Sequence, residues 1–216
     1  DIRAQNLPGD LPSNVAVLTG RDGMRALDVA TGQVVLRSKT RLEPVLGGYV
    51  TEGDPDNGVF SFYDEHGAQV GRYEIPRRTT GTPTGSQQLP MLDINPQKTG
   101  LILDRHGVPM VAIEAPSLHN SRIIGTSVFV SDNRDIIQAT NWAKYDLRTG
   151  KRTASCPRVP LAQNNFVGSD GKVIVGSFDD PSRPVARTLV GVDSDSCKTL
   201  WDLAGVDGVW TIGSTL

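Results

Sequence analysis

The chain has 216 residues, of which 38% are hydrophobic and 21% charged, with a formal net charge of −2 at pH 7. This composition can bury a core, and no window approaches the roughly 18 apolar residues that a membrane-spanning helix needs. The near-neutral charge excludes the basic surface that nucleic-acid binders usually carry, so we expect no nucleic-acid partner.

Short apolar runs recur along the chain in a fixed order. In the first repeat, residues 15–18 precede a polar loop, a second run ends at Asp28, and a short turn leads to a third run. The fifth repeat has the same order, with residues 173–176, a longer loop, a run that ends at Asp193, a turn and a final run. Between them, the equivalent aspartates are Asp64, Asp104 and Asp146. Runs of this length, separated by turn residues, predict β-strands.

The spacing of the five aspartates predicts the fold. They are 36, 40, 42 and 47 residues apart, which is the period of one four-stranded blade of a β-propeller. We therefore predict an all-β fold, a β-propeller of four-stranded antiparallel blades. In four repeats a glycine three or four residues after the aspartate supplies the positive φ of the turn, and the aspartate can accept turn N–H groups. The aspartates are thus interpreted as turn-forming residues.

The two ends of the chain predict how the ring closes. No well-patterned innermost strand precedes Val15, whereas residues 208–213 look like an innermost strand without a blade. We predict that this C-terminal strand completes the N-terminal blade, so that residues 1–216 form a single domain of five blades with no unpaired edge. The alternative is that the chain is part of a larger propeller, in a longer anchored protein.

The chain contains two cysteines, Cys156 and Cys197. An even number suits one disulfide in an oxidising compartment. The predicted register, however, places Cys156 at the end of one outer strand and Cys197 at the start of the next, at opposite rims of the ring. A disulfide needs Cα atoms about 4.4 to 6.8 Å apart, so one disulfide and two buried free thiols both remain open.

Three segments carry a resemblance to a known repeat. Residues 25–36, 144–151 and 191–201 resemble the PQQ-like propeller repeat, in which a Leu-Asp pair precedes a Thr-Gly turn and a strand that ends in Trp. The resemblance implies a propeller of the superfamily that includes quinoprotein dehydrogenases and a non-catalytic lipoprotein scaffold for outer-membrane protein assembly. The chain departs from it because the final Trp is absent from four repeats and Cys197 replaces the turn glycine.

The long loops of the repeats predict a binding surface. In an up-and-down blade, the loops between the second and third strands share one face with the connectors between blades, and function on rigid β-scaffolds usually lies in such loops. Mixed charge with arginines and an aromatic residue suits a protein or peptide partner. The predicted partner-binding residues are Asp54, Asp56, Arg77, Arg78, Asp132, Arg134, Phe178, Asp179, Asp180 and Arg183.

Residues that could carry chemistry are few. His66 and His106 occupy the same place in consecutive turns, and His119 lies in a connector with no second histidine nearby. Residues 52–58 alternate carboxylates with glycine, but the strand that follows cannot wrap a calcium ion as an EF-hand loop does. The chain has no Gly-x-Ser-x-Gly motif and no adjacent cysteines of the kind that quinoproteins place beneath their cofactor. We predict no catalytic residue, metal or cofactor, and an enzyme is the less favoured class.

These observations favour a non-catalytic, extracytoplasmic β-propeller that binds or scaffolds a protein or peptide of the bacterial cell envelope. Periplasm, cell wall and secretion all fit, and membrane contact is expected only through an anchor outside this chain. A carbohydrate-binding or glycoside-hydrolase propeller is the alternative, and a quinoprotein-related remnant is the third. A lectin would repeat its aromatic clusters from blade to blade, which Trp142, Trp201 and Trp210 do not do.

Overall fold

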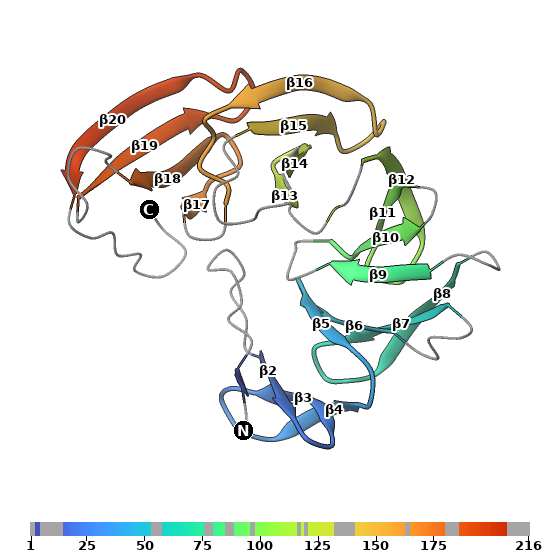
Figure 1. The fold of residues 1–216 in the computed structure, drawn as a ribbon. Helices are drawn as coiled ribbons and strands as arrows, with labels where there is room; N and C mark the ends of the chain where they lie inside the picture. Colours follow the sequence, from blue (N-terminus) through green and yellow to red (C-terminus); the bar gives the residue numbers. More distant parts are fainter. Residues whose placement is uncertain are drawn as a thin grey trace. The chain divides into compact units, whose positions relative to one another are not determined.

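The computed structural model describes the parts of the chain that follow: residues 3–4, 15–52, 58–75, 80–84, 89–95, 98–115, 118, 121–131, 141–162, 165–179 and 186–206. These residues form five antiparallel sheets of four strands each, which we call the first to fifth blades in chain order (Figure 1). The predicted all-β fold of four-stranded antiparallel blades is confirmed. In this described part, no helix is long and apolar enough to cross a membrane.

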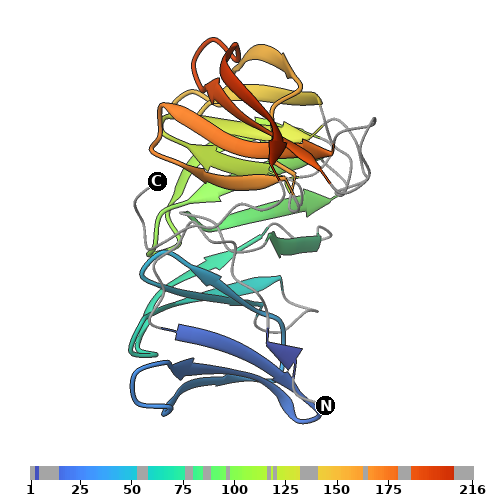
Figure 2. The same ribbon diagram turned by 90° about the vertical axis from the view of Figure 1, so that its left-hand side faces the viewer.

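The chain divides into two compact units, residues 1–119 and residues 120–216. The first unit contains three blades, whose strands lie side by side in Figure 2. The first blade consists of β1 (Arg3–Ala4), β2 (Val15–Gly20), β3 (Gly23–Asp28) and β4 (Val34–Ser38). The second consists of β5 (Leu42–Val45), β6 (Gly48–Glu52), β7 (Val59–Asp64) and β8 (Gln69–Glu74). The third consists of β9 (Thr80–Thr84), β10 (Met91–Asn95), β11 (Thr99–Leu103) and β12 (Pro109–Glu114).

The second unit contains two blades. The fourth blade consists of β13 (Ser121–Ile124), β14 (Ser127–Ser131), β15 (Asn141–Asp146) and β16 (Arg152–Pro157). The fifth consists of β17 (Phe166–Ser169), β18 (Val173–Asp179), β19 (Arg187–Asp193) and β20 (Thr199–Val206). The prediction of a single domain over residues 1–216 remains a prediction, and each unit is described here by itself.

The first blade corrects the predicted closure. Its innermost strand is β1, which pairs antiparallel with β2 through Arg3 opposite Thr19 and Ala4 opposite Leu18. The prediction that a C-terminal strand completes this blade is therefore wrong, because the blade already has four strands from its own N-terminal segment. A strand of two residues shows no alternation of apolar and polar side chains, which is why the sequence pattern did not reveal it. Residues 208–213 lie outside the described residues.

Alternating side chains build the core of the first unit. In β7, Phe60 and Phe62 are buried while Ser61 between them is only half-buried, as expected for a strand with period 2. The first and second blades share a cluster that includes Ala26 and Tyr49. The second and third blades share a larger cluster in which Phe62 is accompanied by residues of β10 and β11. Contact between neighbouring blades, rather than within one sheet, therefore forms these cores.

In the described residues of the second unit, a core lies between the two blades. Phe129 and Trp142 of the fourth blade pack in one cluster with Ile174 and Val190 of the fifth. The β14 strand is buried along its whole length, because both of its faces are covered. Such a strand reads in the sequence as a continuous run without alternation.

The five aspartates lie where the third strand of each blade meets the turn to the fourth, and all five accept turn N–H groups. For example, Asp64 Oδ1 accepts the N–H groups of His66 and Ala68, each at 2.9 Å. The equivalent aspartates are Asp28, Asp104, Asp146 and Asp193. The residue that closes each turn has positive φ, from 58° at Cys197 to 82° at Gly67. The interpretation of the aspartates as turn-forming residues is confirmed.

Candidate functional site

Most of the predicted binding surface lies outside the described residues. Of the ten predicted residues, the structure describes Phe178 and Asp179, at the end of β18. The other eight fall in loops that are not described: Asp54, Asp56, Arg77, Arg78, Asp132, Arg134, Asp180 and Arg183. The candidate site is therefore built from Phe178, Asp179 and the described residues around them.

Asp179 is held by a residue of the neighbouring strand. It lies opposite Arg187 of β19, and the Arg187 Nε donates to Asp179 Oδ1 at 3.2 Å. The same guanidinium donates to the hydroxyl of Ser177, at 3.1 Å, which is itself buried. The Asp179 side chain is 84% exposed, so this ion pair stabilises the fold by at most about 1 kcal/mol. It presents a carboxylate and a guanidinium together at the loop end of the fifth blade.

Phe178 lies beside this pair but is not a free apolar anchor. Its side chain is half-buried and packs against the core cluster of the second unit. The guanidinium carbon of Arg158 lies 5.9 Å from the centroid of the Phe178 ring, within the range of a cation–π contact. Arg158 is exposed and has a φ of 57° in the segment after β16. The fourth and fifth blades therefore both contribute to one mixed surface of Arg158, Phe178, Asp179 and Arg187, which we call the loop-end cluster.

Sequence reasoning did not find Arg187 or Ser177. Arg187 opens the strand that follows the loop, and its role depends on its cross-strand position opposite Asp179. The signal that could have indicated Arg187 is its position: it is the first residue of a strand, and carboxylates end the strand on the other side of the preceding loop. Ser177 gives no such signal, because a buried hydroxyl resembles any polar residue of a strand.

The loop end of the second blade contains a second ion pair. Arg41 Nε donates to a carboxylate oxygen of Glu43, whose side chain is buried on β5. The Thr40 hydroxyl donates to the main-chain oxygen of Glu52, so the connector between the first two blades is fixed at this end. A buried carboxylate held by one arginine suits a structural role better than an exchangeable site.

The opposite end of each blade is occupied by turn hydrogen bonds. The Thr149 hydroxyl and N–H groups lower the pKa of Asp146, and the equivalent contacts of Ser196 lower the pKa of Asp193. His66 and His106 lie in exposed turns. The His66 Nε2 atom lies 3.6 Å from Glu65 Oε1, and the His106 Nδ1 atom lies 3.8 Å from Asp104 Oδ2. His119 is not described. Across the described ranges, no group of three or more His, Cys, Asp and Glu side chains lies together.

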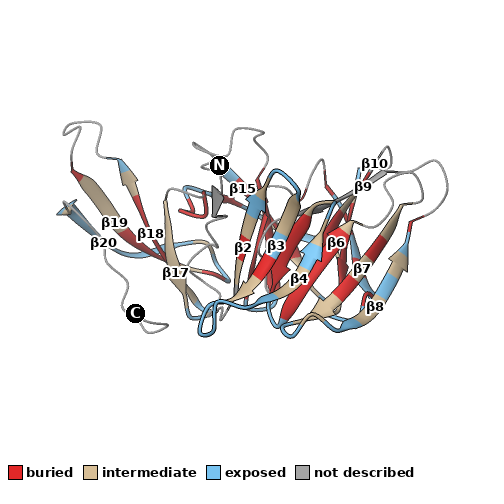
Figure 3. Cartoon of the chain, turned by 90° about the horizontal axis from the view of Figure 1, so that it is seen from below, coloured by how far each residue is buried: buried red, intermediate tan, exposed pale blue. Residues whose placement is uncertain are grey.

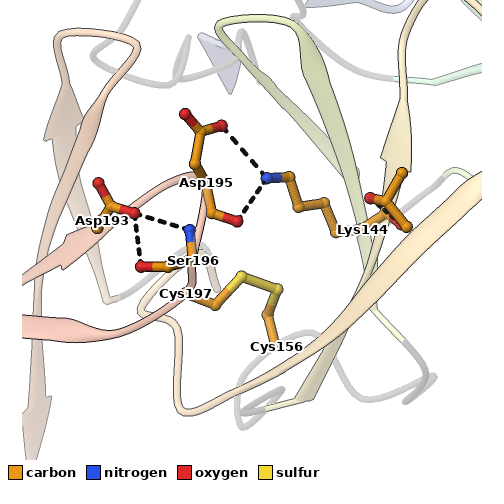
Figure 4. Close-up of a disulfide and its surroundings, with 7 residues drawn as sticks. Lys144, Cys156, Asp193, Asp195, Ser196 and Cys197 are labelled. Carbon is orange, nitrogen blue, oxygen red and sulfur yellow. Dashed lines mark hydrogen bonds and ion pairs between the residues drawn. A yellow bond between two sulfur atoms is a disulfide. The ribbon is translucent and has the colours of Figure 1, made fainter.

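A disulfide joins the two blades of the second unit. Cys156 of β16 and Cys197 of the turn before β20 have Cα atoms 5.4 Å apart and are bonded (Figure 4). The expectation that the register places them at opposite rims is wrong, because the turn of the fifth blade packs onto the outer strand of the fourth. Next to the disulfide, Lys144 Nζ donates to the main-chain oxygen of Asp195 at 2.9 Å. The two contacts fix the same turn from adjacent strands.

Comparison with protein families identifies a family that covers most of the chain. A family model described as a conjugation-associated 9-bladed beta-propeller domain matches residues 17–216. The fold is therefore a β-propeller, and the blade number of that description differs from the five predicted. A comparison with curated proteins finds no match.

Solved structures with the same fold differ strongly in sequence. The dihydro-heme d1 dehydrogenase NirN, in complex with DHE, matches 94% of this chain with a TM-score of 0.53 and 12% identity. BamB from Moraxella catarrhalis matches 78% of this chain with a TM-score of 0.47 and 16% identity. The matches cover 46% of the NirN chain and 48% of the BamB chain, so this chain spans about half the length of both. At 12% identity, the match to NirN shows the fold alone.

Proposed function

Because this chain belongs to the family of conjugation-associated 9-bladed β-propeller domains, we propose that it is an extracytoplasmic module that binds a protein of a conjugation apparatus. The family description is the single observation that carries this proposal. The propeller supplies a rigid support, and the loops at one end of its blades supply the contacts. The resemblance to PQQ-like repeats is consistent with this proposal and adds no cofactor to it.

The disulfide supports a location outside the cytoplasm. Bonds of this kind persist in oxidising compartments and are rare where thioredoxin and glutathione keep thiols reduced. Cys156 is fully buried and its partner Cys197 is half-buried, as in a structural disulfide. The periplasm, the cell wall and the medium fit this chemistry equally.

The chemistry of the described residues supports binding rather than catalysis. The recurrent aspartates accept hydrogen bonds from their own turns, so their carboxylates are engaged in holding the backbone. The loop-end cluster instead combines a carboxylate, two guanidinium groups and an aromatic ring on one surface. Arginine and aromatic side chains are enriched where proteins bind one another. We propose that this cluster forms a partner-binding surface. A role for the eight predicted residues that lie outside the described part of the chain stays a prediction.

A matched pair of photo-crosslinking variants tests this proposal. A photoreactive amino acid is placed at Asp179, whose side chain is 84% exposed at the loop end, or at Asp195, which is 88% exposed at the turn end. In conjugating donor cells we expect the Asp179 variant to crosslink to one defined component of the apparatus, at least 10-fold more than the Asp195 variant. Equal crosslinking from both positions would contradict the assignment of the surface.

Conjugation itself provides the second measurement. In a donor that lacks the gene, we expect complementation by Asp179→Arg to give at least 10-fold fewer transconjugants than complementation by Asp195→Arg, with both proteins present at wild-type levels. Asp195 is a suitable control because it holds Lys144 chiefly through its main-chain oxygen, which the substitution leaves in place. If transfer does not depend on the gene at all, a conjugation partner is excluded.

A further inference from the structure

The outer strand of the fifth blade is exposed to solvent, whereas the equivalent strand is partly buried in another blade. The β20 strand is exposed over seven of its eight residues, with Trp201 at 43% and Leu203 at 57% exposure. Figure 3 shows this strand in pale blue, whereas β6 and β7 carry red, buried segments. The equivalent outer strand of the third blade, β12, buries Val111 and Ile113. An exposed apolar face of this kind indicates an interaction surface.

The neighbouring blades show what covers this face elsewhere. In the first unit, a Cβ added at Gly67, in the turn of the second blade, would overlap the main-chain oxygen of Val35 in the first blade. A Cβ added at Gly107, in the turn of the third blade, would lie 2.6 Å from the ring of Phe62 in the second. The turn of the second blade therefore packs on the fourth strand of the blade before it, and the turn of the third blade packs on the third strand.

The second unit repeats this arrangement with stronger contacts. Lys144, two residues before Asp146, binds the main-chain oxygen of Asp195 in the turn of the fifth blade. Cys156 is bonded to Cys197, which occupies the positive-φ position of that turn. The same position is therefore the contact point of the turn in three blade pairs.

The strand pairing identifies the residues of the fifth blade that are equivalent to this contact point. Cys156 lies opposite Trp142, four residues before the turn aspartate, and Leu203 lies opposite Leu189 in the same position of the fifth blade. Two residues before Asp193, Gly191 lies opposite Trp201, whose indole covers it so closely that an added Cβ would overlap the ring. The described residues contain no sheet after the fifth. Trp201 and Leu203 thus occupy the docking positions of a blade that the described residues do not include.

The turn of the first blade has the other half of such a contact, the surface that packs on a preceding blade. Gly32 has a φ of 68° and closes the turn of this blade, as Gly67, Gly107 and Cys197 do in theirs. Among the described residues, no atom lies within 4 Å of a Cβ added at Gly32, although Cβ atoms added at Gly67 and Gly107 would overlap or closely contact the preceding blade. The turn of the first blade is therefore free to pack on a preceding blade.

We propose that Trp201 and Leu203 form the docking surface for a further four-stranded blade, encoded outside these 216 residues, whose turn presents its positive-φ residue to Leu203. The repeated interface determines the geometry of this contact, and apolar burial stabilises it. The occupant is a blade because in three blade pairs of this chain the positive-φ residue of a turn contacts the preceding blade. The fourth and fifth blades supply the position that Leu203 matches, and the family description gives nine blades where the described residues form five. The proposal does not depend on the proposed function.

Thiol labelling measures whether the surface is covered. Leu203→Cys is compared with Val108→Cys, because both native side chains are 57% exposed and Val108 follows the turn of the third blade, which packs on the second blade. In the 216-residue chain, we expect both thiols to react with a maleimide at similar rates. In the protein made from the complete gene, we expect the thiol at position 203 to react at least 10-fold more slowly, while the thiol at position 108 keeps its rate.

Two results of this labelling would overturn the proposal. The first is equal reactivity of both thiols in the product of the complete gene, because the surface would then remain uncovered. The second is protection of the thiol at position 203 already in the 216-residue chain, because a segment of the chain itself would then cover it.

A second variant tests whether the first blade of this chain, rather than a further blade, covers Leu203. In Gly32→Cys/Leu203→Cys, the two new thiols reproduce the positions of Cys197 and Cys156, and Cys197 shows that cysteine accepts the positive φ of this turn. We expect no bond between the new thiols under mild oxidation of the 216-residue chain. A bond within one chain would show that its own first blade is the occupant, a bond between two chains would show a second copy, and either result would replace our proposal.

Discussion

Lys144 of β15 and Asp195 of the fifth blade's turn are joined by a hydrogen bond from the Lys144 ammonium group to the Asp195 main-chain oxygen, 2.9 Å long. The Lys144 side chain is only 9% exposed, whereas the Asp195 carboxylate is 88% exposed and its nearer oxygen lies 3.4 Å from the ammonium. The main-chain contact is therefore the dominant one. It gives a buried cation a partner and fixes a turn of the next blade at the same time.

Removing this cation is expected to destabilise the protein more than removing the carboxylate. Lys144→Met keeps the length of the side chain but leaves the Asp195 carbonyl without its donor, which costs about 2 kcal/mol for a hydrogen bond to a charged group. Asp195→Asn retains the main-chain oxygen and is expected to change the free energy of unfolding by about 0.5 kcal/mol or less. Urea unfolding of the two variants measures the difference. Equal effects would show that the carboxylate, rather than the main chain, holds Lys144.

The disulfide is expected to contribute much of the stability of the second unit. The Cys156 and Cys197 positions are 41 residues apart, and the chain-entropy model gives about 4 kcal/mol for closing a loop of this length. We expect Cys156→Ala/Cys197→Gly to be more stable than Cys156→Ala/Cys197→Ala, by about 1 kcal/mol, because glycine accepts the φ of 58° at this turn without strain. Thermal unfolding of both variants, and of the wild type with and without reductant, tests this order. If the two variants unfold at the same temperature, backbone strain at position 197 is not important.

Gly71 of β8 is expected to tolerate no side chain. A Cβ at this position would overlap the main-chain oxygen of His106 in the turn of the third blade, and backbone cannot move aside as a flexible side chain can. We expect Gly71→Ala to lower the free energy of unfolding by about 2 kcal/mol or more. Gly20→Ala is the control, because the nearest atom to its new Cβ would be 3.8 Å away, and its effect should stay within about 1 kcal/mol. A small effect at Gly71 would mean that the two blades can separate at this contact.

The Asp146 turn is expected to lose stability in acid. The Thr149 hydroxyl donates to Asp146 Oδ1 at 2.8 Å and, with the N–H groups of Thr149 and Arg148, lowers the pKa of the Asp146 carboxyl in the folded state. A lowered folded-state pKa stabilises the protein above the unfolded pKa, and this contribution is lost as the pH falls through the folded value.

Thr149→Val removes the hydroxyl and keeps the shape of the side chain. We expect its stability deficit to be complete at pH 7 and to begin to shrink below about pH 4. The deficit should vanish only when the pH falls below the lowered pKa of Asp146 in the folded wild type, where the carboxyl is protonated in both proteins. NMR titration of the Asp146 carboxyl carbon should show its pKa closer to the ordinary value in the variant. A deficit that does not change with pH would indicate lost packing instead of a lost hydrogen bond.

The sequence predicted the blades because their pattern is local. Each run that ends at an aspartate, such as β7 before Asp64, contains its own alternation and its own turn signal, so its assignment needs no distant contact. The same reasoning interpreted the five aspartates correctly as turn residues. It failed at β1, where two residues carry no period.

Relationships between blades could not be predicted in the same way. The Cys156–Cys197 distance depends on how the turn of one blade packs on the outer strand of another, and the register within each blade contains no information on that packing. Arg187 of the loop-end cluster was missed for a similar reason, because its partner Asp179 lies across a loop on the neighbouring strand. Long-range pairing of this kind depends on the twist and stacking of sheets.

The exchange of glycine for cysteine at position 197 has a consequence for how such repeats can diversify. The turn position already lies against the preceding blade, so a single codon change, with one matching change on the outer strand, converts packing into a covalent link while the backbone keeps its positive φ. At Gly67 the same exchange is blocked, because a Cβ there would overlap the main-chain oxygen of Val35. A propeller of this type can therefore gain a cross-link between blades in an oxidising environment only where the preceding blade leaves room for a side chain at the turn.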